Sequence, residues 1–285
     1  MNSPLISAQD LQALMQSPTP PLVADCTFHL DNTRLGREQF ESGHIVGAIY
    51  ADLDQDLSAK RAEDAINGGR HPLPQRDVFA RTLGRLGITP SHTVVVYDRI
   101  GTMVAGRLWW MLRWCGHADV RILDGGWAAW QALGGQESTG ASSSSPCDAY
   151  PLGQPLEALI LQEQVLANLG QAQQTLVDAR GGPRYRGEVE PIDPVAGHIP
   201  GALNRPFTDN FQADGRFKSP EMLRQEWATL LNGQTTDTVV AYCGSGVSAV
   251  PNLIGLAIAG LPAQGLYAGS WSEWCRTPNL PSERN

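Results

Sequence analysis

A cysteine followed by a glycine-rich loop is the part of the sequence best suited to chemistry. Cys243 ends the apolar run 238–242, and it is followed by Gly244, Ser245, Gly246, Val247 and Ser248. Two glycines let the backbone curl so that successive N–H groups point inward and form a nest for an anion. A helix that begins near residue 249 would add the partial positive charge of its N-terminus. Because this environment favours a thiolate, we predict that Cys243 is a nucleophile.

The same segment has a simpler interpretation. Glycine-rich turns between a strand and a helix are common, and a buried cysteine usually behaves as a small, inert apolar residue. A second run, 93–97, matches 238–242 but ends in Asp98-Arg99-Ile100-Gly101 instead of the cysteine loop. Ligands of α/β sheets bind beyond the carboxyl ends of the strands. A cysteine at the position where two matching segments diverge is therefore a candidate for an active site.

The matching runs are part of a repeat that covers most of the chain. The corresponding blocks are LVADC (22–26) with LVDAR (176–180), SGHIVGAIY (42–50) with AGHIPGALN (196–204), TVVVYD (93–98) with TVVAYC (238–243), and DGGWAAW (124–130) with AGSWSEW (268–274). Their order is the same in both halves. A period of this length is too long for a solenoid and indicates two copies of one fold.

Each copy has the pattern of an α/β domain. The β-branched runs at 22–24 and 94–96 are typical of buried parallel strands. Helices are predicted over 7–15, with Ser7 as the N-cap, over 105–115, and over 249–259, with Pro251 in the first turn. This alternation predicts two tandem domains, each a doubly wound, mainly parallel sheet flanked by helices.

A stretch rich in glycine, serine and proline separates the two copies. It spans 134–153 and has no hydrophobic periodicity, which is typical of a flexible or surface connection. We therefore expect one domain at 1–138, a linker at 139–154, and a second domain at 155–285.

The composition limits the classes of function. The net charge is −8 and no basic run is present, which argues against nucleic acid or an anionic membrane as a partner. The N-terminal residues do not resemble a signal peptide, and no stretch reaches the ~18 apolar residues of a membrane span. We expect a cytoplasmic monomer. The five cysteines are widely spaced and form no CxxC pair, so neither a disulfide framework nor a zinc site is predicted.

The motifs resemble the tandem rhodanese-type sulfurtransferases over nearly the whole chain. The strings that carry the resemblance are HPLP (71–74), RLGI (85–88) and LWWMLRWCGH (108–117) in the first copy, and RYRG (184–187), YCGSGVSA (242–249) and GSWSEW (269–274) in the second. The resemblance implies an inactive first domain and a catalytic second domain in which Cys243 carries sulfur as a persulfide. It implies no metal or organic cofactor.

The uncharged loop 244–249 resembles the branch of the family that uses 3-mercaptopyruvate. The branch that uses thiosulfate typically has Arg and Lys after the cysteine, which suits a compact dianion. The resemblance therefore implies 3-mercaptopyruvate as the donor, with thiosulfate as the second choice. The acceptor would be cyanide, a dithiol or a thioredoxin-like protein.

The resemblance also implies which residue binds the donor. Arg184 matches the family's substrate-binding arginine, and a guanidinium can hold a carboxylate through two hydrogen bonds. The nearby Arg180 and Arg186 are alternatives to it. A second arginine, which the 3-mercaptopyruvate branch often has after a Glu-Pro step, is replaced here by Ile192.

Two further side chains have open roles. Ser245 either donates a hydrogen bond to the sulfur or to the leaving enolate, or it stabilises the loop. The resemblance places His44 near the cleft between the domains, where it is a candidate for a proton relay. His198 occupies the same place in the other copy, and this favours a structural turn for both histidines.

Two other classes of function compete with sulfur transfer. A phosphatase with a related cysteine loop needs an arginine after five intervening residues to bind the phosphoryl oxygens, and Ala249 stands there. A non-enzymatic sulfur relay or binding module is the second alternative, and an intact cysteine loop is compatible with it.

Overall fold

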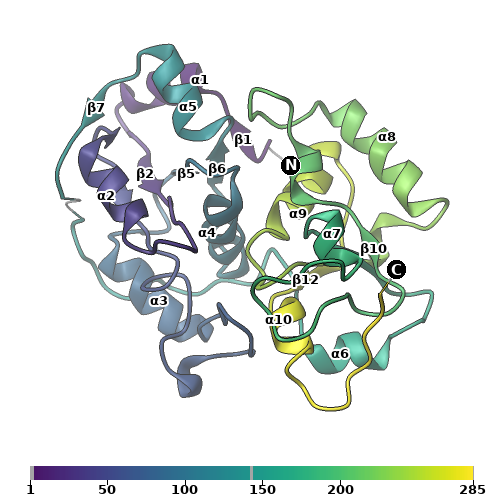
Figure 1. Ribbon diagram of the computed structural model, residues 1–285. Coiled ribbons are helices and arrows are strands. Elements are labelled where there is room, and N and C mark those ends of the chain that lie inside the picture. The colour runs from purple at the N-terminus through teal and green to yellow at the C-terminus, as the bar shows by residue number, and fades with distance from the viewer. Residues whose placement is uncertain (1–2, 142–143, 285) are drawn as a thin grey trace. The chain divides into compact units, whose positions relative to one another are not determined.

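The computed structural model describes residues 3–141 and 144–284, which divide into two compact units (Figure 1). The first unit comprises the chain up to Asp64, Pro74–Glu157 and Ala213–Arg216. The second comprises Ala65–Leu73, Ala158–Gln212 and the residues from Phe217 onward. The two units therefore exchange one short loop each, because 65–73 belongs to the second unit and 213–216 to the first.

The first unit is built on a five-stranded sheet with the order β1-β6-β5-β2-β4, and every pair of neighbouring strands is parallel. Its elements are β1 (Leu5–Ile6), α1 (Ala8–Met15), β2 (Leu22–Asp25), α2 (Leu35–Ser42), β3 (His44–Ile45), β4 (Ile49–Tyr50), α3 (Arg76–Arg85), β5 (Val94–Tyr97), α4 (Met103–Trp114), β6 (Val120–Leu123), α5 (Gly126–Leu133) and β7 (Glu137–Ser138), with a 3-10 turn at Ala62–Asp64. Strands β3 and β7 form a separate antiparallel pair.

The second unit repeats this arrangement. Its sheet has the order β10-β9-β11-β12-β8, again with parallel neighbours throughout. Its elements are β8 (Leu159–Ile160), α6 (Gln162–Ala167), β9 (Thr175–Asp178), α7 (Gly182–Tyr185), β10 (Leu203–Asn204), α8 (Pro220–Leu231), β11 (Val239–Tyr242), α9 (Val250–Ala259), β12 (Gly265–Tyr267) and α10 (Ser270–Trp274), with 3-10 turns at Phe207–Asn210 and Thr236–Thr238. The predicted pair of parallel α/β domains is confirmed.

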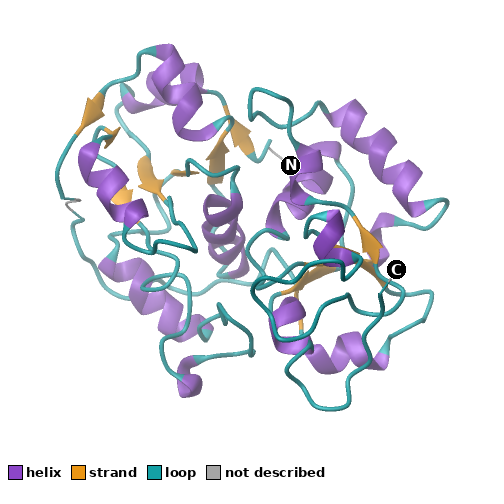
Figure 2. Ribbon diagram, in the orientation of Figure 1, coloured by secondary structure: helices purple, strands orange, loops and turns teal. Residues whose placement is uncertain are grey.

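Alternating strand residues divide the core of the first unit between the two faces of its sheet. Val95 and Tyr97 of β5 share one apolar cluster with Leu11 of α1, Phe40 of α2 and Trp127 of α5. The intervening β5 residues point to the other face, because strand side chains alternate, and helix α4 packs on β5 and β6. In the second unit α9 packs on β11 and β12 and against α8, and Figure 2 shows these helices beside the sheet.

Local sequence explains where the helices begin. Ser7 accepts a hydrogen bond from the Asp10 N–H at 3.0 Å and caps α1, as predicted. The helices predicted over 105–115 and 249–259 are present as α4 and α9, with starts shifted by one or two residues. Pro251 lies in the first turn of α9, where a missing N–H does not break the helix.

The described part of the predicted linker runs along the first unit. The Cys147 N–H donates a hydrogen bond to the Gly84 carbonyl at 2.9 Å, and the Tyr150 N–H donates one to the Ala80 carbonyl at 2.9 Å. Residues 142 and 143 lie outside the described residues. Among the described residues no helix has the length and apolar character needed to cross a membrane.

Candidate active site

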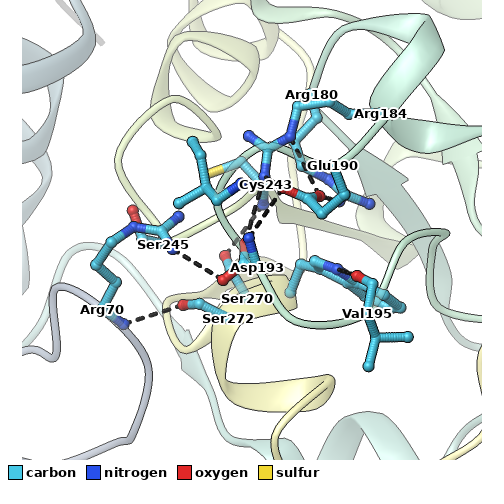
Figure 3. Close-up of polar contacts among 12 residues, drawn as sticks. Arg70, Arg180, Arg184, Glu190, Asp193, Val195, Cys243, Ser245, Ser270 and Ser272 are labelled. Atoms are coloured by element: carbon cyan, nitrogen blue, oxygen red, sulfur yellow. Dashed lines mark hydrogen bonds and ion pairs between the residues drawn. The ribbon is translucent and has the colours of Figure 1, made fainter. Parts of the chain in front are cut away.

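The cysteine loop connects β11 to α9 and is fastened from below by the start of α10 (Figure 3). Cys243 is 1 % exposed, and its N–H donates to the Ser270 hydroxyl at 3.0 Å. The Cys243 carbonyl accepts from the Trp271 N–H at 3.0 Å, and the Gly244 carbonyl accepts from the Ser272 N–H at 2.9 Å. Three hydrogen bonds to consecutive residues of one helix therefore fix the direction of the Cys243 side chain.

The turn of the loop requires glycine at 246. Gly246 has a φ of +71°, a conformation that costs other residues free energy. A Cβ at this position would also collide with the Ala268 carbonyl. The backbone therefore folds back tightly between Cys243 and α9.

The first unit shows what this loop binds, because Asp98 occupies the position of Cys243. The Asp98 carboxylate accepts four backbone N–H groups at 2.9–3.0 Å, from Ile100, Thr102, Val104 and Ala105. The loop of the first copy is therefore a nest filled by an anion from its own chain.

In the second copy the corresponding N–H groups have no anion from the chain. Among the described residues, the N–H groups of Ser245, Val247 and Ala249 have no hydrogen-bond acceptor. Loop residues 243–247 and Ala249 are nevertheless buried, and a buried N–H without a partner is costly. The arrangement suits a negative charge on Cys243 Sγ.

Two arginines border the loop on the side of Gly244. A Cβ built on Gly244 would lie 3.1 Å from Arg70 Nη2 and 3.6 Å from Arg184 Nη1. Both guanidiniums are held by Asp193, whose Oδ1 lies 2.8 Å from Arg70 Nη1 and whose Oδ2 lies 3.3 Å from Arg184 Nη2. Glu190 adds a bond of 2.7 Å to Arg184 Nη2. Figure 3 shows these side chains gathered next to Cys243.

The other two arginines of this segment have different surroundings. Arg180 is buried, lies over the Trp271 ring, and pairs with Asp178 at 2.6 Å. Its Nη2 also donates to the Gly197 carbonyl at 2.7 Å, so its guanidinium is used within the core. Arg186 is exposed and pairs with Glu188. Of the three predicted alternatives, the structure places Arg184 beside the cysteine loop.

Ser245 is paired with a histidine that comes from the first half of the sequence. The Ser245 hydroxyl lies 2.9 Å from His71 Nδ1, and both residues are buried. Val247 is buried as well, and Ser248 is half-buried. A hydroxyl held by an imidazole can pass a proton, so this contact is compatible with a chemical role for Ser245, which stays a prediction.

His44 lies in the first unit, where both ring nitrogens have partners. Nδ1 lies 2.7 Å from the Phe40 carbonyl and Nε2 lies 2.9 Å from the Ser138 hydroxyl, while the ring stacks on Phe40. His198 repeats the arrangement in the second unit with Tyr185. These contacts fit the structural interpretation of both histidines, and a relay through His44 stays a prediction.

Three of the other four cysteines have a raised pKa, which makes them poor nucleophiles. Burial, together with Asp25, raises the pKa of Cys26 well above its ordinary value. Burial also raises the pKa of Cys115 to about 11 and raises the pKa of Cys275. A raised pKa favours the protonated form of these three thiols, which is less nucleophilic than the thiolate. Cys147 lies exposed on the linker.

Comparison with known proteins agrees with this geometry. The model of the rhodanese-like domain matches residues 7–133 and 161–277. The chain belongs to the rhodanese-like family. Apart from the exchanged loops 65–73 and 213–216, the two matched segments lie in the two units of the structure, so each unit is built on one rhodanese-like domain.

The relatives of these domains include sulfurtransferases named for two different donors. A probable 3-mercaptopyruvate sulfurtransferase from Pseudomonas aeruginosa is 48% identical over 279 residues, covering 97% of this chain and 96% of that protein. A thiosulfate sulfurtransferase from Mus musculus is 34% identical over 262 residues, covering 89% and 84%. SseA from Escherichia coli, a 3-mercaptopyruvate sulfotransferase, aligns with a TM-score of 0.80 at 29% identity, covering 95% and 100%.

Sequence reasoning missed three components of the site. Arg70 and His71 lie in the segment 65–73, and only the string HPLP at 71–74 drew attention to it. Ser270 lies within the repeated block 268–274. The first copy has Gly126 at the same position, and this difference between the copies is the signal that could have pointed to Ser270. The contacts of these three residues with the cysteine loop are created by the fold, so no local sequence pattern predicts them.

Proposed function

We propose that this protein transfers sulfur from 3-mercaptopyruvate to a thiophilic acceptor through a persulfide on Cys243. The observation that carries the proposal is the buried Cys243 at the head of a loop in which the N–H groups of Ser245, Val247 and Ala249 have no acceptor among the described residues. The loop lies beside the guanidiniums of Arg70 and Arg184. Such a site stabilises a thiolate or persulfide and attracts an anionic donor.

The reaction divides into two displacements. The Cys243 thiolate attacks the sulfur of 3-mercaptopyruvate, an S–S bond forms, and the C–S bond breaks. The carbon keeps the electron pair as the enolate of pyruvate, which then takes up a proton at carbon. The outer sulfur of the persulfide passes to the acceptor, and the Cys243 thiolate is restored. Covalent storage of the sulfur separates one difficult transfer into two easier steps.

The surrounding side chains have separate tasks in the first step. Arg184 binds the donor's carboxylate, because its guanidinium is held beside Gly244 by Glu190 and Asp193. The Ser245 hydroxyl, paired with His71, is placed to stabilise the enolate and to deliver its proton. Arg180 supports the site indirectly through its ion pair with Asp178.

Several finer points of the sequence-based prediction remain part of this proposal. The acceptor would be cyanide, a dithiol or a thioredoxin-like protein. Thiosulfate is the second donor, and the relative named for it keeps this alternative in view. The boundaries 1–138, 139–154 and 155–285, the monomeric state and the cytoplasmic location also stay predictions.

The test is mass spectrometry of the protein after treatment with 3-mercaptopyruvate in the absence of acceptor. One added sulfur should appear on the peptide that contains Cys243, and Cys243→Ser should abolish it. Cys26→Ser is the matched control, because burial raises the pKa of that thiol and it should carry no sulfur. Loading of the Cys26 or Cys115 peptide to the same extent would contradict the assignment.

Steady-state turnover with the two donors side by side tests the choice of donor. We expect a higher kcat/KM for 3-mercaptopyruvate, because the loop itself has no charge and the nearby guanidiniums of Arg70 and Arg184 lie beside Gly244. A higher kcat/KM for thiosulfate would overturn the donor while leaving the persulfide chemistry intact.

A further inference from the structure

A cavity of about 570 Å³ lies in the second unit, between the end of strand β10 and helix α8. Asn204 and Arg205 line it at the carboxyl end of β10, which is an edge strand of the sheet. Ligands of α/β sheets bind beyond the carboxyl ends of the strands. The described residues that line the cavity include none from the cysteine loop 243–249. Its volume falls in the range of about 300–1,000 Å³ that is typical of small-molecule sites.

Helix α8 contributes one of its faces to the cavity. The residues of this face are spaced by three or four positions, so they lie on the same side of the helix. They are Met222, Gln225, Glu226 and Thr229. A different side of α8, which includes Trp227, is buried. Met222 is 46% exposed, so an apolar side chain stands open beside polar ones and suits a ligand that has both kinds of group.

Arg205 is buried in the wall of the cavity with most of its donors unused. Its side chain is 6% exposed, and its guanidinium lies over the Trp227 ring. Its acceptors all bond to Nη2: Glu226 Oε2 at 2.8 Å, the Asp209 carbonyl at 3.2 Å and Asn210 Oδ1 at 3.4 Å. Nε is buried without an acceptor, and Nη1 also has none in the described part of the chain. Because unpaired donors in a buried guanidinium cost free energy, an acceptor from a ligand would stabilise this side chain.

The charges around the cavity suit a molecule that has both signs of charge. Lys218 Nζ lies 2.7 Å from Glu226 Oε1, so Arg205 and Lys218 share a single carboxylate and one positive charge is left over. Asp209 also lines the cavity, and among the described residues its carboxylate has no partner. A simple anion would be attracted by the two cations and repelled by Asp209. A zwitterion finds a partner for each of its charges.

We propose that this cavity binds an α-amino acid with an aliphatic side chain. The amino acid's carboxylate binds Arg205 and Lys218, and its ammonium binds Asp209. Its side chain contacts Met222 and Leu230, the apolar residues that line the cavity. The proposal does not rest on the persulfide chemistry of Cys243.

The experiment measures the binding of three matched probes to the full chain by saturation-transfer NMR. L-leucine carries both charges, 4-methylpentanoate is leucine without the ammonium, and 3-methylbutylamine is leucine without the carboxylate. We expect the Kd of L-leucine to be at least fivefold lower than that of either analogue. If 4-methylpentanoate binds as tightly as L-leucine, the assignment to an amino acid is wrong. The absence of saturation transfer to L-leucine at millimolar concentrations would overturn the site itself.

Two variants test the partners of the carboxylate. Arg205→Gln and Lys218→Gln should each raise the Kd of L-leucine at least tenfold, because a charge-assisted hydrogen bond is lost. Lys218 is partly exposed, so Lys218→Gln keeps the test decisive if the buried Arg205→Gln does not fold. The matched control is Arg224→Gln. Arg224 lies on α8 and pairs with Glu221 outside the cavity, and this variant should leave the Kd within twofold.

Asp209→Asn tests the partner of the ammonium. It should raise the Kd of L-leucine at least fivefold and leave the Kd of 4-methylpentanoate unchanged or lower, because the carboxylate that opposes the anion is gone. Asp237→Asn removes another exposed carboxylate of the second unit and is the control. Equal affinity for L-leucine in Asp209→Asn and in the wild type would contradict the contact with the ammonium.

A last variant separates this cavity from the cysteine site, which also has arginines. Arg184→Gln should leave the Kd of L-leucine within twofold. A Kd that rises in Arg184→Gln but not in Lys218→Gln would place the probe beside Cys243 and overturn the proposal. Failure of Cys243 to acquire sulfur from 3-mercaptopyruvate contradicts the proposed function alone, since none of these binding measurements depends on it.

Discussion

At the scale of single residues, Ser270 stands out because its backbone is strained. It has a φ of +55°, and the corresponding residue of the first copy is Gly126, with a φ of +54°. A residue other than glycine in this conformation costs about 1 kcal/mol. The serine hydroxyl accepts the Cys243 N–H and donates to the Tyr267 carbonyl at 2.9 Å. The strain therefore accompanies a contact that only the copy with the cysteine needs.

We predict that Ser270→Gly slows the loading of Cys243 about tenfold and lowers the free energy of unfolding by only about 1 kcal/mol. The relief of backbone strain, about 1 kcal/mol, partly offsets the loss of the two hydrogen bonds of the hydroxyl, which contribute about 1 kcal/mol each. Urea denaturation and the rate of persulfide formation measure the two effects.

Gly126→Ser is the control for Ser270→Gly. Its Cβ would collide with the Asp98 carbonyl, so it should destabilise the protein more than Ser270→Gly does. Loading at the wild-type rate in Ser270→Gly would show that the hydroxyl does not position Cys243.

The site was predictable from sequence only where two copies could be compared. Cys243 was found because the first copy has Asp98 at the same place, and Arg184 was found through the family resemblance. Arg70 could not be predicted as part of the site from the sequence, because Gly244 lies far along the chain and the fold brings the two residues together. The buried ion pair of Arg180 is likewise a product of packing.

At the scale of elements, the linker is held to the first unit by a buried histidine. His117 Nδ1 lies 2.9 Å from the Tyr150 hydroxyl, and its Nε2 faces the Asp119 carbonyl at 3.3 Å. Burial lowers the pKa of His117 below its ordinary value. The neutral ring, with Nε2–H as donor and Nδ1 as acceptor, fits both contacts.

The stability of the protein should therefore fall as the pH drops below about 6.5. Above that value His117 is neutral in both states and contributes no pH dependence. Below it the unfolded chain binds a proton that the folded protein takes up only at a lower pH, so the free energy of unfolding decreases by up to about 1.4 kcal/mol per pH unit. The measurement is urea denaturation at several pH values between 8 and 5, compared between the wild type and His117→Gln.

His117→Gln should show the shallower dependence on pH, because the other titrating groups are common to both proteins. Two parallel profiles would show that this contact does not contribute to acid sensitivity.

The helices predicted over 7–15, 105–115 and 249–259 are present in the structure, because apolar periodicity and caps are local signals. Ser7 at the start of α1 and Pro251 in the first turn of α9 both act as expected. The exchange of 65–73 and 213–216 between the units was not foreseen, since nothing in their composition indicates which sheet they join.

At the scale of the whole molecule, the two copies use the same type of loop, after Asp98 in one and after Cys243 in the other, for different purposes. Asp98 fills its own nest, and although burial raises its pKa, hydrogen bonds from Ala105 and other N–H groups oppose that shift. The exchanged segment 213–216 brings Asp214 to a pocket of about 220 Å³ that Asp98 and Arg99 also line. Where the second unit receives Arg70 from its exchanged loop, the first unit receives Asp214 together with Arg216, its ion-pair partner at 3.9 Å.

We predict that Asp98→Cys does not create a second sulfur carrier. Ile100 stands in the place of Ser245, so the loop of the first copy lacks the hydroxyl that is paired with His71 in the second. Loading by 3-mercaptopyruvate, measured by mass spectrometry of the peptide around position 98, should be at least tenfold slower than loading of Cys243. Equal rates at the two positions would mean that the nest alone is sufficient for the chemistry.

The reciprocal exchange of loops has a consequence for the history of the gene. If an ancestral gene encoded one copy, its product had to complete its site without a segment from a second copy. Once 65–73 supplied Arg70 and His71 to the later copy, loss of the first half of the gene would have removed both residues. Selection on the activity proposed for Cys243 would then preserve the first copy as well. A lineage that discards the first half should be found only where another residue pairs with Ser245 in place of His71.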